Sequence, residues 1–336
     1  MKQLFEKLYQ QKNLAEGEMK QVAQAMFSGQ LRESQISAFL IALKLKGVTS
    51  YEMAALAQVL QQAALKIDNT PVTAMDNCGT GGDNLQTFNI STTAAFVLAA
   101  GGIPMAKHGN RSISSRSGSA DVLEALGVKL ALSKQALSYL LNEIGIAFLF
   151  APAMHKNMCY VSKIRQELAT PTILNLIGPL TNPVTLQTQL MGTCAGDLIK
   201  ETCETLMHLG RKRAIVLHGF GGMDEANLSG DTQYALFDGE NVTQHVVSSK
   251  ELGLPTYEIA AISGGDAKEN SEILLSVLQN KTSPYLDTVI LNAAFGFYAN
   301  GKVLSLTKGI EYARSIIASG AAYDKLQQLI KLQEVA

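Results

Sequence analysis

The first 67 residues contain apolar runs typical of helices, and no strand-like alternation interrupts them. Thr49 and Glu52 have the spacing of a capping box at the start of one helix. Gly47 stands where the preceding helix should end in a glycine cap. The pattern therefore predicts a small all-helical domain, which we assign to residues 1–68.

From about residue 70 the pattern changes to apolar strands that run into small residues and alternate with helices. The segments in which we expect strands are 72–83, 103–109, 147–153, 213–222 and 287–294. Helices are expected in 91–102 and 119–128, and Asp238-Gly239 predicts a hairpin at the sheet edge. This alternation predicts an α/β domain over residues 69–336, with a mostly parallel central sheet flanked by helices.

Charge and cysteine content exclude several classes of protein. Lys and Arg number 28 against 29 Asp and Glu, so no global basic field exists to hold nucleic acid or an anionic membrane. The four cysteines form no C-x-x-C pair and are too sparse for a disulfide scaffold. No stretch of 18 apolar residues is present. We expect a cytoplasmic protein with reduced thiols and with no nucleic-acid or membrane partner.

A glycine-rich loop, GTGGD at 79–83, follows the first predicted strand, and NIST at 89–92 then opens an apolar helix. Glycines let backbone N–H groups approach an anion closely, and a helix start attracts phosphate. Asn84 stands where a dinucleotide-binding fingerprint needs its last glycine, and no P-loop follows. The loop therefore predicts a phosphate site of another kind, with a tight turn before an ordinary helix as the alternative.

A second polar segment, residues 107–119, joins a predicted strand to a predicted helix. Lys107, His108, Arg111 and Arg116 lie within it among serines and glycines. Cations mixed with hydroxyls suit a polyanion such as pyrophosphate. A solvated polar loop is the alternative.

Two adjacent acids, Asp224 and Glu225, follow the glycines of HGFGGMDE at 218–225. Neighbouring carboxylates repel each other unless a cation joins them, and Mg²⁺ bound to carboxylates and substrate phosphates fits this pattern. Two exposed acids at a helix start are the alternative.

Arg165 offers a bidentate site for a carboxylate, or is a surface arginine on a helix. His155 is equally open to a binding or a structural interpretation. The chain has no H-E-x-x-H, no G-x-S-x-G and no zinc-type cluster of Cys and His. It therefore gives no sign of a zinc hydrolase or of a serine hydrolase.

Taken together, these segments resemble the anthranilate phosphoribosyltransferases over essentially the whole chain. The motifs that carry the resemblance, in their order along the chain, are GTGGD (79–83), NIST (89–92), KHGNRSISS (107–115), SGSADVLEALG (117–127), Arg165, NLIGPLTNP (175–183), HGFGGMDE (218–225), SGGDAKEN (263–270) and LNAA (291–294). The order and spacing of so many motifs are far more specific than any single one.

The resemblance implies an enzyme that transfers the phosphoribosyl group of phosphoribosyl pyrophosphate (PRPP) to the amine of anthranilate and releases pyrophosphate. It also implies that a segment near residues 165–190 joins the helical domain, that homodimers form through the helical domains, and that Mg²⁺ is required. Departure of pyrophosphate needs charge stabilisation more than a strong base, which agrees with the absence of a catalytic triad.

The same resemblance assigns residues. The PRPP site would comprise Gly79, Gly82, Asp83, Thr87, Asn89, Ile90, Ser91, Thr92, Lys107, His108, Gly109, Asn110, Arg111, Ser112, Ile113, Ser114, Ser115 and Ser119. The anthranilate site would comprise Gly79, His108, Asn110, His155 and Arg165, with Arg165 facing the carboxylate. Ser91, Asp224 and Glu225 would lie at the metal, and Lys107, Asp224 and Glu225 would act in catalysis.

The chain departs from the family pattern beside His155, where Lys156-Asn157 stands in place of a frequent Pro-Ala and Cys159 replaces a common basic residue. These positions bear on affinity for the aromatic substrate. Two alternatives stay open: a pyrimidine nucleoside phosphorylase, which has no evident use for Asp224 and Glu225, and a catalytically silent relative that binds nucleic acid.

Overall fold

The computed structural model describes residues 1–112 and 116–334, and the chain begins with four helices. These are α1 (Lys2–Tyr9), α2 (Glu16–Phe27), α3 (Glu33–Lys46) and α4 (Ser50–Ala63). The predicted capping box is confirmed, because Thr49 Oγ1 accepts the Glu52 N–H at 3.2 Å and Glu52 Oε2 accepts the Thr49 N–H at 3.0 Å. Gly47 ends α3 with a φ of 82°, a conformation that favours glycine.

A seven-stranded sheet forms the centre of the larger domain, in the order β3-β2-β1-β4-β5-β6-β7. Its strands are β1 (Met75–Asp76), β2 (Met105–Gly109), β3 (Ile146–Phe150), β4 (Thr188–Gly192), β5 (Arg213–His218), β6 (Thr232–Phe237) and β7 (Val242–Val247). The first five in this order pair in parallel, and β6 and β7 form the expected antiparallel hairpin at one edge. The predicted fold class is therefore confirmed.

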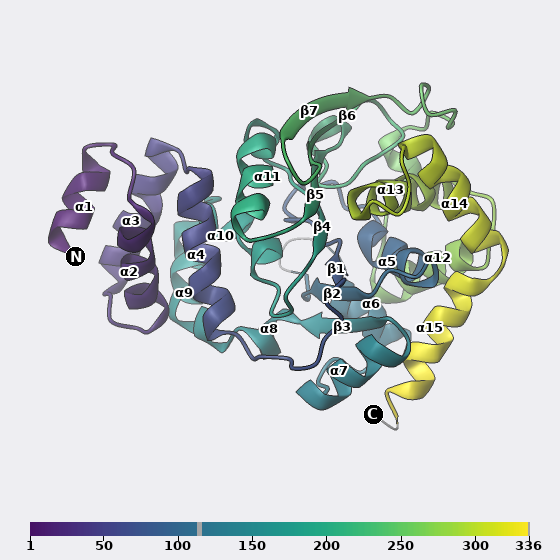
Figure 1. Cartoon of the computed structure of the whole chain (residues 1–336), viewed down its shortest axis with the longest axis horizontal. Coiled ribbons are helices and arrows are strands. Elements are labelled where there is room, and N and C mark those ends of the chain that lie inside the picture. Colours follow the sequence, from purple (N-terminus) through teal and green to yellow (C-terminus); the bar gives the residue numbers. More distant parts are fainter. Residues whose placement is uncertain (113–115, 335–336) are drawn as a thin grey trace.

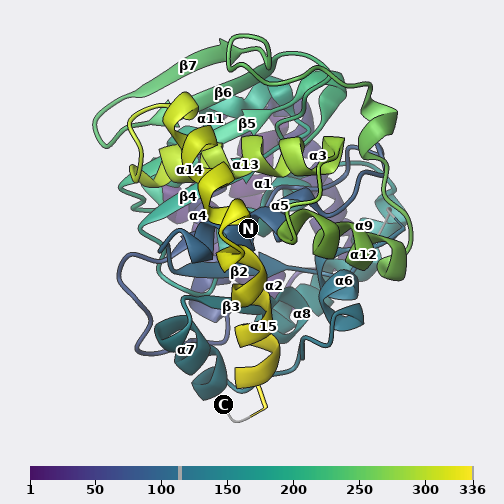
Figure 2. The same cartoon turned by 90° about the vertical axis from the view of Figure 1, so that its right-hand side faces the viewer.

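Helices cover both faces of the sheet (Figures 1 and 2). On one side α11 (Ile199–His208) lies between the sheet and α4. On the other side α5 (Ile90–Ala100) and α13 (Pro284–Asn300) pack on the sheet, and α14 (Leu306–Ala318) covers α13. The larger domain also contains α6 (Ser119–Ala125), α7 (Lys134–Glu143), α12 (Ala267–Leu278), α15 (Ala321–Leu332), η3 (Gly196–Leu198), η4 (Phe220–Gly222) and η5 (Ile259–Ile262).

A segment from the middle of the chain packs on the N-terminal helices. It consists of α8 (Ala151–Met154), η1 (Lys156–Met158), α9 (Cys159–Leu168), α10 (Ile173–Leu176) and η2 (Gly178–Thr181). Ile164, Leu174 and Leu180 share one apolar core with residues of α2, α3 and α4. Of the stretch 165–190, the part from Thr188 onward belongs to β4. The chain therefore leaves the helical domain before β1, returns to it after β3 and leaves it again before β4.

One predicted strand is wrong: residues 287–294 form the interior of α13. All but one of the residues of this helix from Leu286 to Ala299 are buried, so its apolar run has no polar face to reveal a helical period. A short apolar run of this kind does not distinguish a buried helix from a buried strand.

None of the helices formed by the described residues combines the length and the apolar character needed to cross a membrane.

Candidate active site

The polar segments singled out in the sequence meet at one edge of the sheet. They follow β1, β2 and β5, which run parallel to one another, so the carboxyl ends of these strands point the same way. In sheets of this type ligands bind at the carboxyl ends of the strands. The fold thus brings residues 77–89, 110–112, 116–119 and 219–227 to the same edge.

The adjacent acids join the glycine-rich loop to the start of α5. Asp224 Oδ2 accepts the backbone N–H of Gly81 at 2.6 Å. Glu225 Oε1 accepts the backbone N–H of Ser91, in the first turn of α5, at 3.2 Å. The two carboxylates therefore accept one backbone N–H of the glycine-rich loop and one at the start of α5.

Both acids have raised pKa values. Burial, together with repulsion from Asp83, raises the pKa of the Asp224 carboxyl to about 6. Burial and repulsion from Asp224 raise the pKa of Glu225 to about 8, against the attraction of Lys107. A hard divalent cation, which prefers oxygen ligands, would relieve the repulsion among Asp83, Asp224 and Glu225. On this observation the residues fit Mg²⁺.

The turn that carries Asp224 needs glycine neighbours. A Cβ added at Gly192, the last residue of β4, would lie 1.6 Å from the Asp224 carbonyl oxygen, and one at Gly79 would lie 2.4 Å from Asp224 Oδ2. A Cβ at Gly219 would lie 2.1 Å from the Glu225 carbonyl oxygen. The acids thus lie where the backbones of three segments come into contact. Gly192 belongs to none of the motifs recognised in the sequence.

Lys107, on β2, is buried and points at the start of α5. Its Nζ donates to Ser91 Oγ at 3.2 Å, and its charge attracts Glu225 and Asp76. A buried ammonium beside a helix start provides fixed positive potential for a phosphate. The structure therefore brings Ser91, Lys107 and Glu225 together.

Other members of the predicted PRPP set face the site in different ways. Gly82 is exposed, with a φ of 85°, and Asp83 and Thr87 are partly exposed. Ile90 and Thr92 are buried, and the Ile90 N–H donates to the Phe88 carbonyl oxygen at 2.9 Å. These two residues therefore pack chiefly into the core.

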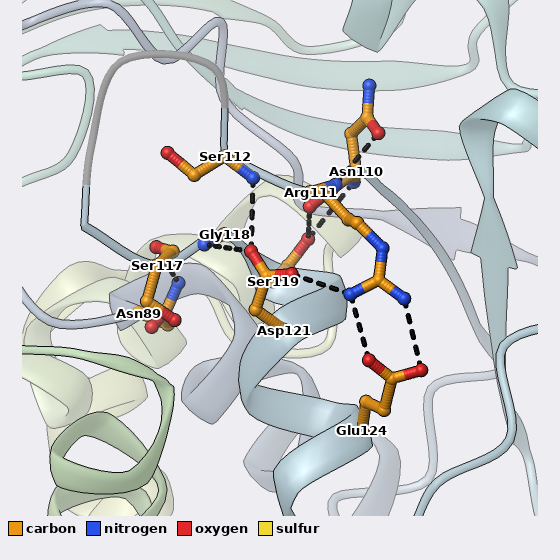
Figure 3. A network of polar contacts seen from close by, with 9 residues as sticks. All are labelled: Asn89, Asn110, Arg111, Ser112, Ser117, Gly118, Ser119, Asp121 and Glu124. Atoms are coloured by element: carbon orange, nitrogen blue, oxygen red, sulfur yellow. Dashed lines mark hydrogen bonds and ion pairs between the residues drawn. The ribbon is translucent and has the colours of Figure 1, made fainter.

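Figure 3 shows the described ends of the 107–119 segment. Asn110 and Ser119 are joined by two hydrogen bonds, each of 3.2 Å, between backbone groups of Asn110 and the Ser119 hydroxyl. Asp121 Oδ2 accepts the backbone N–H groups of both Ser112 and Gly118, and so holds these two residues close together. Ile113, Ser114 and Ser115 lie outside the described residues.

Arg111 is engaged by α6. Its guanidinium donates to Asp121 at 2.8 Å and to both carboxylate oxygens of Glu124 at 2.8 and 3.0 Å (Figure 3). It also lies over the Phe150 ring, 5.8 Å from the ring centroid. In this arrangement its charge is already compensated by two carboxylates. Gly109, just before it, allows close contact, because an added Cβ would lie 2.3 Å from Ser119 Oγ.

Two buried histidines form a pair beside these loops. The His108 and His155 rings pack edge to face with their centroids 5.2 Å apart. Burial and the charge of Lys107 lower the pKa of His108 to about 4, and burial and His108 lower the pKa of His155 to about 3. Neither Nε2 has a hydrogen-bond partner among the described residues. The pair thus presents neutral rings with unused polar atoms.

Arg165, on α9, is partly buried, and burial lowers its pKa. It forms no hydrogen bond or ion pair with any residue in the ranges 1–112 and 116–334. A guanidinium without a partner retains its bidentate donors for a ligand.

Sequence reasoning missed Asp76, in the strand expected at 72–83, and Asn182, in the NLIGPLTNP motif. Asp76 is fully buried and accepts the N–H groups of Asn77 and His108, and Asn182 Nδ2 donates to its other oxygen at 2.9 Å. Asp76, Cys78 and His108 could in principle ligate a metal. Three donors already occupy the Asp76 carboxylate. This favours a structural role, in which Asp76 holds β2 and the 177–182 segment together, over a role as a metal ligand.

Asn292 was also missed, although it stands in the LNAA motif of α13. Its Oδ1 accepts the Ala226 N–H at 3.1 Å, and its Nδ2 donates to the Ala226 carbonyl at 2.7 Å. This clamp fixes the backbone directly after the acidic pair. The motif pointed to the residue, but it did not predict that the residue contacts Ala226.

Comparison with known proteins defines the class of this fold. A model described as "Glycosyl transferase family, helical bundle domain" matches residues 2–64, and one described as "Glycosyl transferase family, a/b domain" matches residues 71–323. The protein is thus a glycosyl transferase built from a helical bundle and an α/β domain, which agrees with the two parts of the structure.

Full-length relatives define the family more closely. The chain is 56% identical over 334 residues to the anthranilate phosphoribosyltransferase of Listeria innocua, covering 99% of this chain and 98% of that one. It is 54% identical to that of Streptococcus gordonii, with 99% and 100% covered. The chain belongs to the anthranilate phosphoribosyltransferase family, and the expected activity, transfer of the phosphoribosyl group of PRPP to anthranilate, is confirmed.

Solved structures agree. The enzyme of Thermus thermophilus superposes with a TM-score of 0.93 at 36% identity, covering 98% of this chain and 99% of that one. The Saccharomyces cerevisiae enzyme in complex with PRPP and Mg superposes with a TM-score of 0.90 at 25% identity, covering 99% and 98%.

Proposed function

We propose that the pyrophosphate of PRPP binds between the GTGGD loop and the start of α5, and that the acidic pair holds Mg²⁺ beside it. The single observation that carries this proposal is the bridge made by Asp224 and Glu225 from Gly81 to Ser91. The yeast relative solved with PRPP and Mg supports it. Bound Mg²⁺ would supply positive charge to the leaving pyrophosphate.

The protein's own groups do the remaining work in this proposal. Lys107 and the positive end of the α5 helix dipole stabilise charge as it develops on the leaving group. The residues that we assign to PRPP are Gly79, Gly82, Asp83, Thr87, Asn89, Ile90, Ser91, Thr92, Lys107, His108, Gly109, Asn110, Arg111, Ser112, Ile113, Ser114, Ser115 and Ser119. The metal ligands are Asp224 and Glu225, with Ser91 nearby.

Anthranilate binds, in the same proposal, against Gly79, His108, Asn110, His155 and Arg165. The lack of any partner for Arg165 among the described residues supports pairing with the substrate carboxylate. The neutral, buried imidazoles provide a face for the aromatic ring. Holding the amine against C1 of the ribose converts the attack into an effectively unimolecular step.

The assembly is also part of the proposal. We divide the chain into a helical domain of residues 1–68, joined by the segment near 165–190, and an α/β domain of residues 69–336. Homodimers would form through the helical domain, which carries the exposed apolar side chains of Tyr9, Leu45 and Tyr51. Four free thiols suit the reducing cytoplasm, where we place the protein.

The test follows the loss of anthranilate fluorescence on adding PRPP and Mg²⁺ to the full chain. Loss that requires PRPP and is abolished by EDTA supports the proposal. Retention of full activity in EDTA would refute the metal assignment. Neither the pyrimidine nucleoside phosphorylase nor the silent nucleic-acid-binding relative is favoured by the similar proteins. Phosphorolysis of nucleosides, or DNA affinity that falls steeply with salt, would revive them.

A further inference from the structure

Asn270 has no role in the site described above, although it stands in the SGGDAKEN motif. It lies in the first turn of α12 and is 1% exposed. Its Oδ1 accepts the Gly265 N–H at 2.8 Å, and its Nδ2 donates to Asn89 Oδ1 at 2.9 Å. Asn89 Nδ2 in turn donates to the Ser117 carbonyl oxygen at 3.3 Å. Three hydrogen bonds thus join three separate segments through two side-chain amides.

Backbone groups at the two ends fix the orientation of both amides. The Gly265 N–H can only donate, so the oxygen of Asn270 must face it and the NH₂ group must face Asn89. The Ser117 carbonyl can only accept, so the NH₂ group of Asn89 must face it. Reversing either amide would set like atoms against each other. The Asn89 side chain therefore has one orientation in this network.

The backbone around this network is held in the same place. The Gly264 N–H donates to the Gln86 carbonyl at 2.8 Å, and the Phe88 N–H donates to the Ile262 carbonyl at 3.3 Å. Gln86 has a φ of 52°, which is costly for a residue with a side chain and persists only where neighbours hold it. The SGGDAKEN segment therefore supports the chain as it enters α5.

We infer that Asn270 is a positioning residue for PRPP, an inference that rests on the proposed function. By orienting Asn89, it sets the entry to α5 and its distance from the 107–119 segment at Ser117 before the ligand arrives. Both of these polar segments are assigned to PRPP in the proposal above. A site that is already ordered loses less conformational freedom on binding, so its affinity is higher.

The test is the variant Asn270→Asp, which keeps an acceptor for the Gly265 N–H and removes the donor to Asn89. PRPP affinity, measured by calorimetry with Mg²⁺, should fall about tenfold, as expected for one hydrogen bond at a buried site. The KM for PRPP should rise by a similar factor, while the KM for anthranilate stays unchanged and kcat changes less than about threefold. A Kd and KM for PRPP within about twofold of wild type would overturn the inference.

Asn300→Ala is the matched control, because Asn300 Nδ2 donates to Thr188 Oγ1 at 2.9 Å at the amino end of β4. It loses a comparable amide bond at the end of the strand opposite the site, and should leave PRPP affinity unchanged. If it weakens PRPP binding as much as Asn270→Asp does, the effect is a general loss of stability and the inference fails.

A double-mutant cycle separates positioning through Asn89 from the added negative charge. In an Asn89→Ala background, Asn270→Asp should change PRPP affinity by less than about twofold, because the residue through which it acts is gone. A tenfold effect that persists there would be a charge effect and would overturn the inference. Asn270→Ala, which adds no charge, serves as the second variant in the same cycle.

The outcomes also distinguish this inference from the proposed function. Anthranilate that is not consumed by wild-type protein would refute the proposed function, while the PRPP affinities would still decide the role of Asn270. Normal wild-type activity with unchanged PRPP binding in the variants would refute the inference alone. Failure of both Asn270 variants to fold would show a purely structural role and would overturn it.

Discussion

Two clusters of buried charge, one in each domain, differ in what surrounds them. In the helical domain the side chains of Lys46 and Glu52 are 3% and 0% exposed and lie 2.8 Å apart. Glu52 also accepts the N–H groups of Leu14 and Thr49, and Lys46 donates to Asn13 Oδ1 and the Gly47 carbonyl. Every charge there has an opposite charge and several hydrogen bonds, and the cluster ties the segment before α2 to α3 and α4.

The cluster at the sheet edge has an excess of negative charge. Asp83, Asp224 and Glu225 repel one another while Lys107 attracts Glu225, and burial together with this repulsion raises the pKa values of Asp224 and Glu225. Burying charge without full compensation costs stability. The comparison teaches that burial alone does not mark a functional charge. What distinguishes the functional cluster is that its negative charge is only partly compensated by the protein, so that a cation and a polyanionic substrate can complete the compensation.

The largest expected effect follows from neutralising the sheet-edge cluster. Asp224→Asn/Glu225→Gln should lower kcat/KM by about 10³-fold or more, because the charge that would hold Mg²⁺ is lost. The free energy of unfolding should stay the same or rise, since uncompensated buried charge has been removed. Anthranilate fluorescence measures the first quantity and urea denaturation the second. Glu240→Gln on the exposed β6–β7 turn is the control, and strong destabilisation by the double variant would break the comparison.

The opposite pattern is expected in the helical domain. Glu52→Gln leaves Lys46 buried without its counter-charge, which should lower the free energy of unfolding by about 3 to 5 kcal/mol. At a temperature where the variant remains folded, kcat/KM should stay within about twofold of wild type, because the cluster touches no part of the site. Urea denaturation and the fluorescence assay measure the two quantities. A large loss of kcat/KM in the folded variant would contradict a purely structural role.

The sheet-edge cluster should also make the stability of the metal-free protein depend on pH. Because the folded-state pKa values of Asp224 and Glu225, about 6 and about 8, lie above those of exposed carboxyls, the folded protein binds more protons than the unfolded chain between about pH 4 and 8. These groups should therefore lower the free energy of unfolding by several kcal/mol as pH rises through that window.

Urea denaturation at several pH values checks this sign. The decline should be absent in Asp224→Asn/Glu225→Gln and smaller with saturating Mg²⁺, which competes with protons for the same oxygens. Mg²⁺ affinity should correspondingly increase from pH 6 to pH 8. A decline of equal size in the neutralised variant would assign it to other groups.

Sequence patterns predicted the two-domain fold, the edge hairpin and the capping box because each depends on local spacing. The strand expected at 287–294 was wrong because a fully buried helix has no polar face. At the site, the sequence identified the loops but not Gly192, Asn270 or Asn292. Their importance lies in contacts with residues 32, 181 and 66 positions away, and no local pattern records such a distance.

The smallest effect concerns an ion pair in the helical domain that is not buried. Lys163 on α9 and Glu33 on α3 lie 2.9 Å apart, with side chains 65% and 60% exposed. Glu33→Gln should change the free energy of unfolding by less than about 0.5 kcal/mol, because water and salt screen the pair. Set beside Glu52→Gln, it holds the substitution and the domain constant and varies only burial and hydrogen bonding. A loss approaching that of Glu52→Gln would show that pairing, rather than burial with full hydrogen bonding, makes the Lys46–Glu52 cluster stabilising.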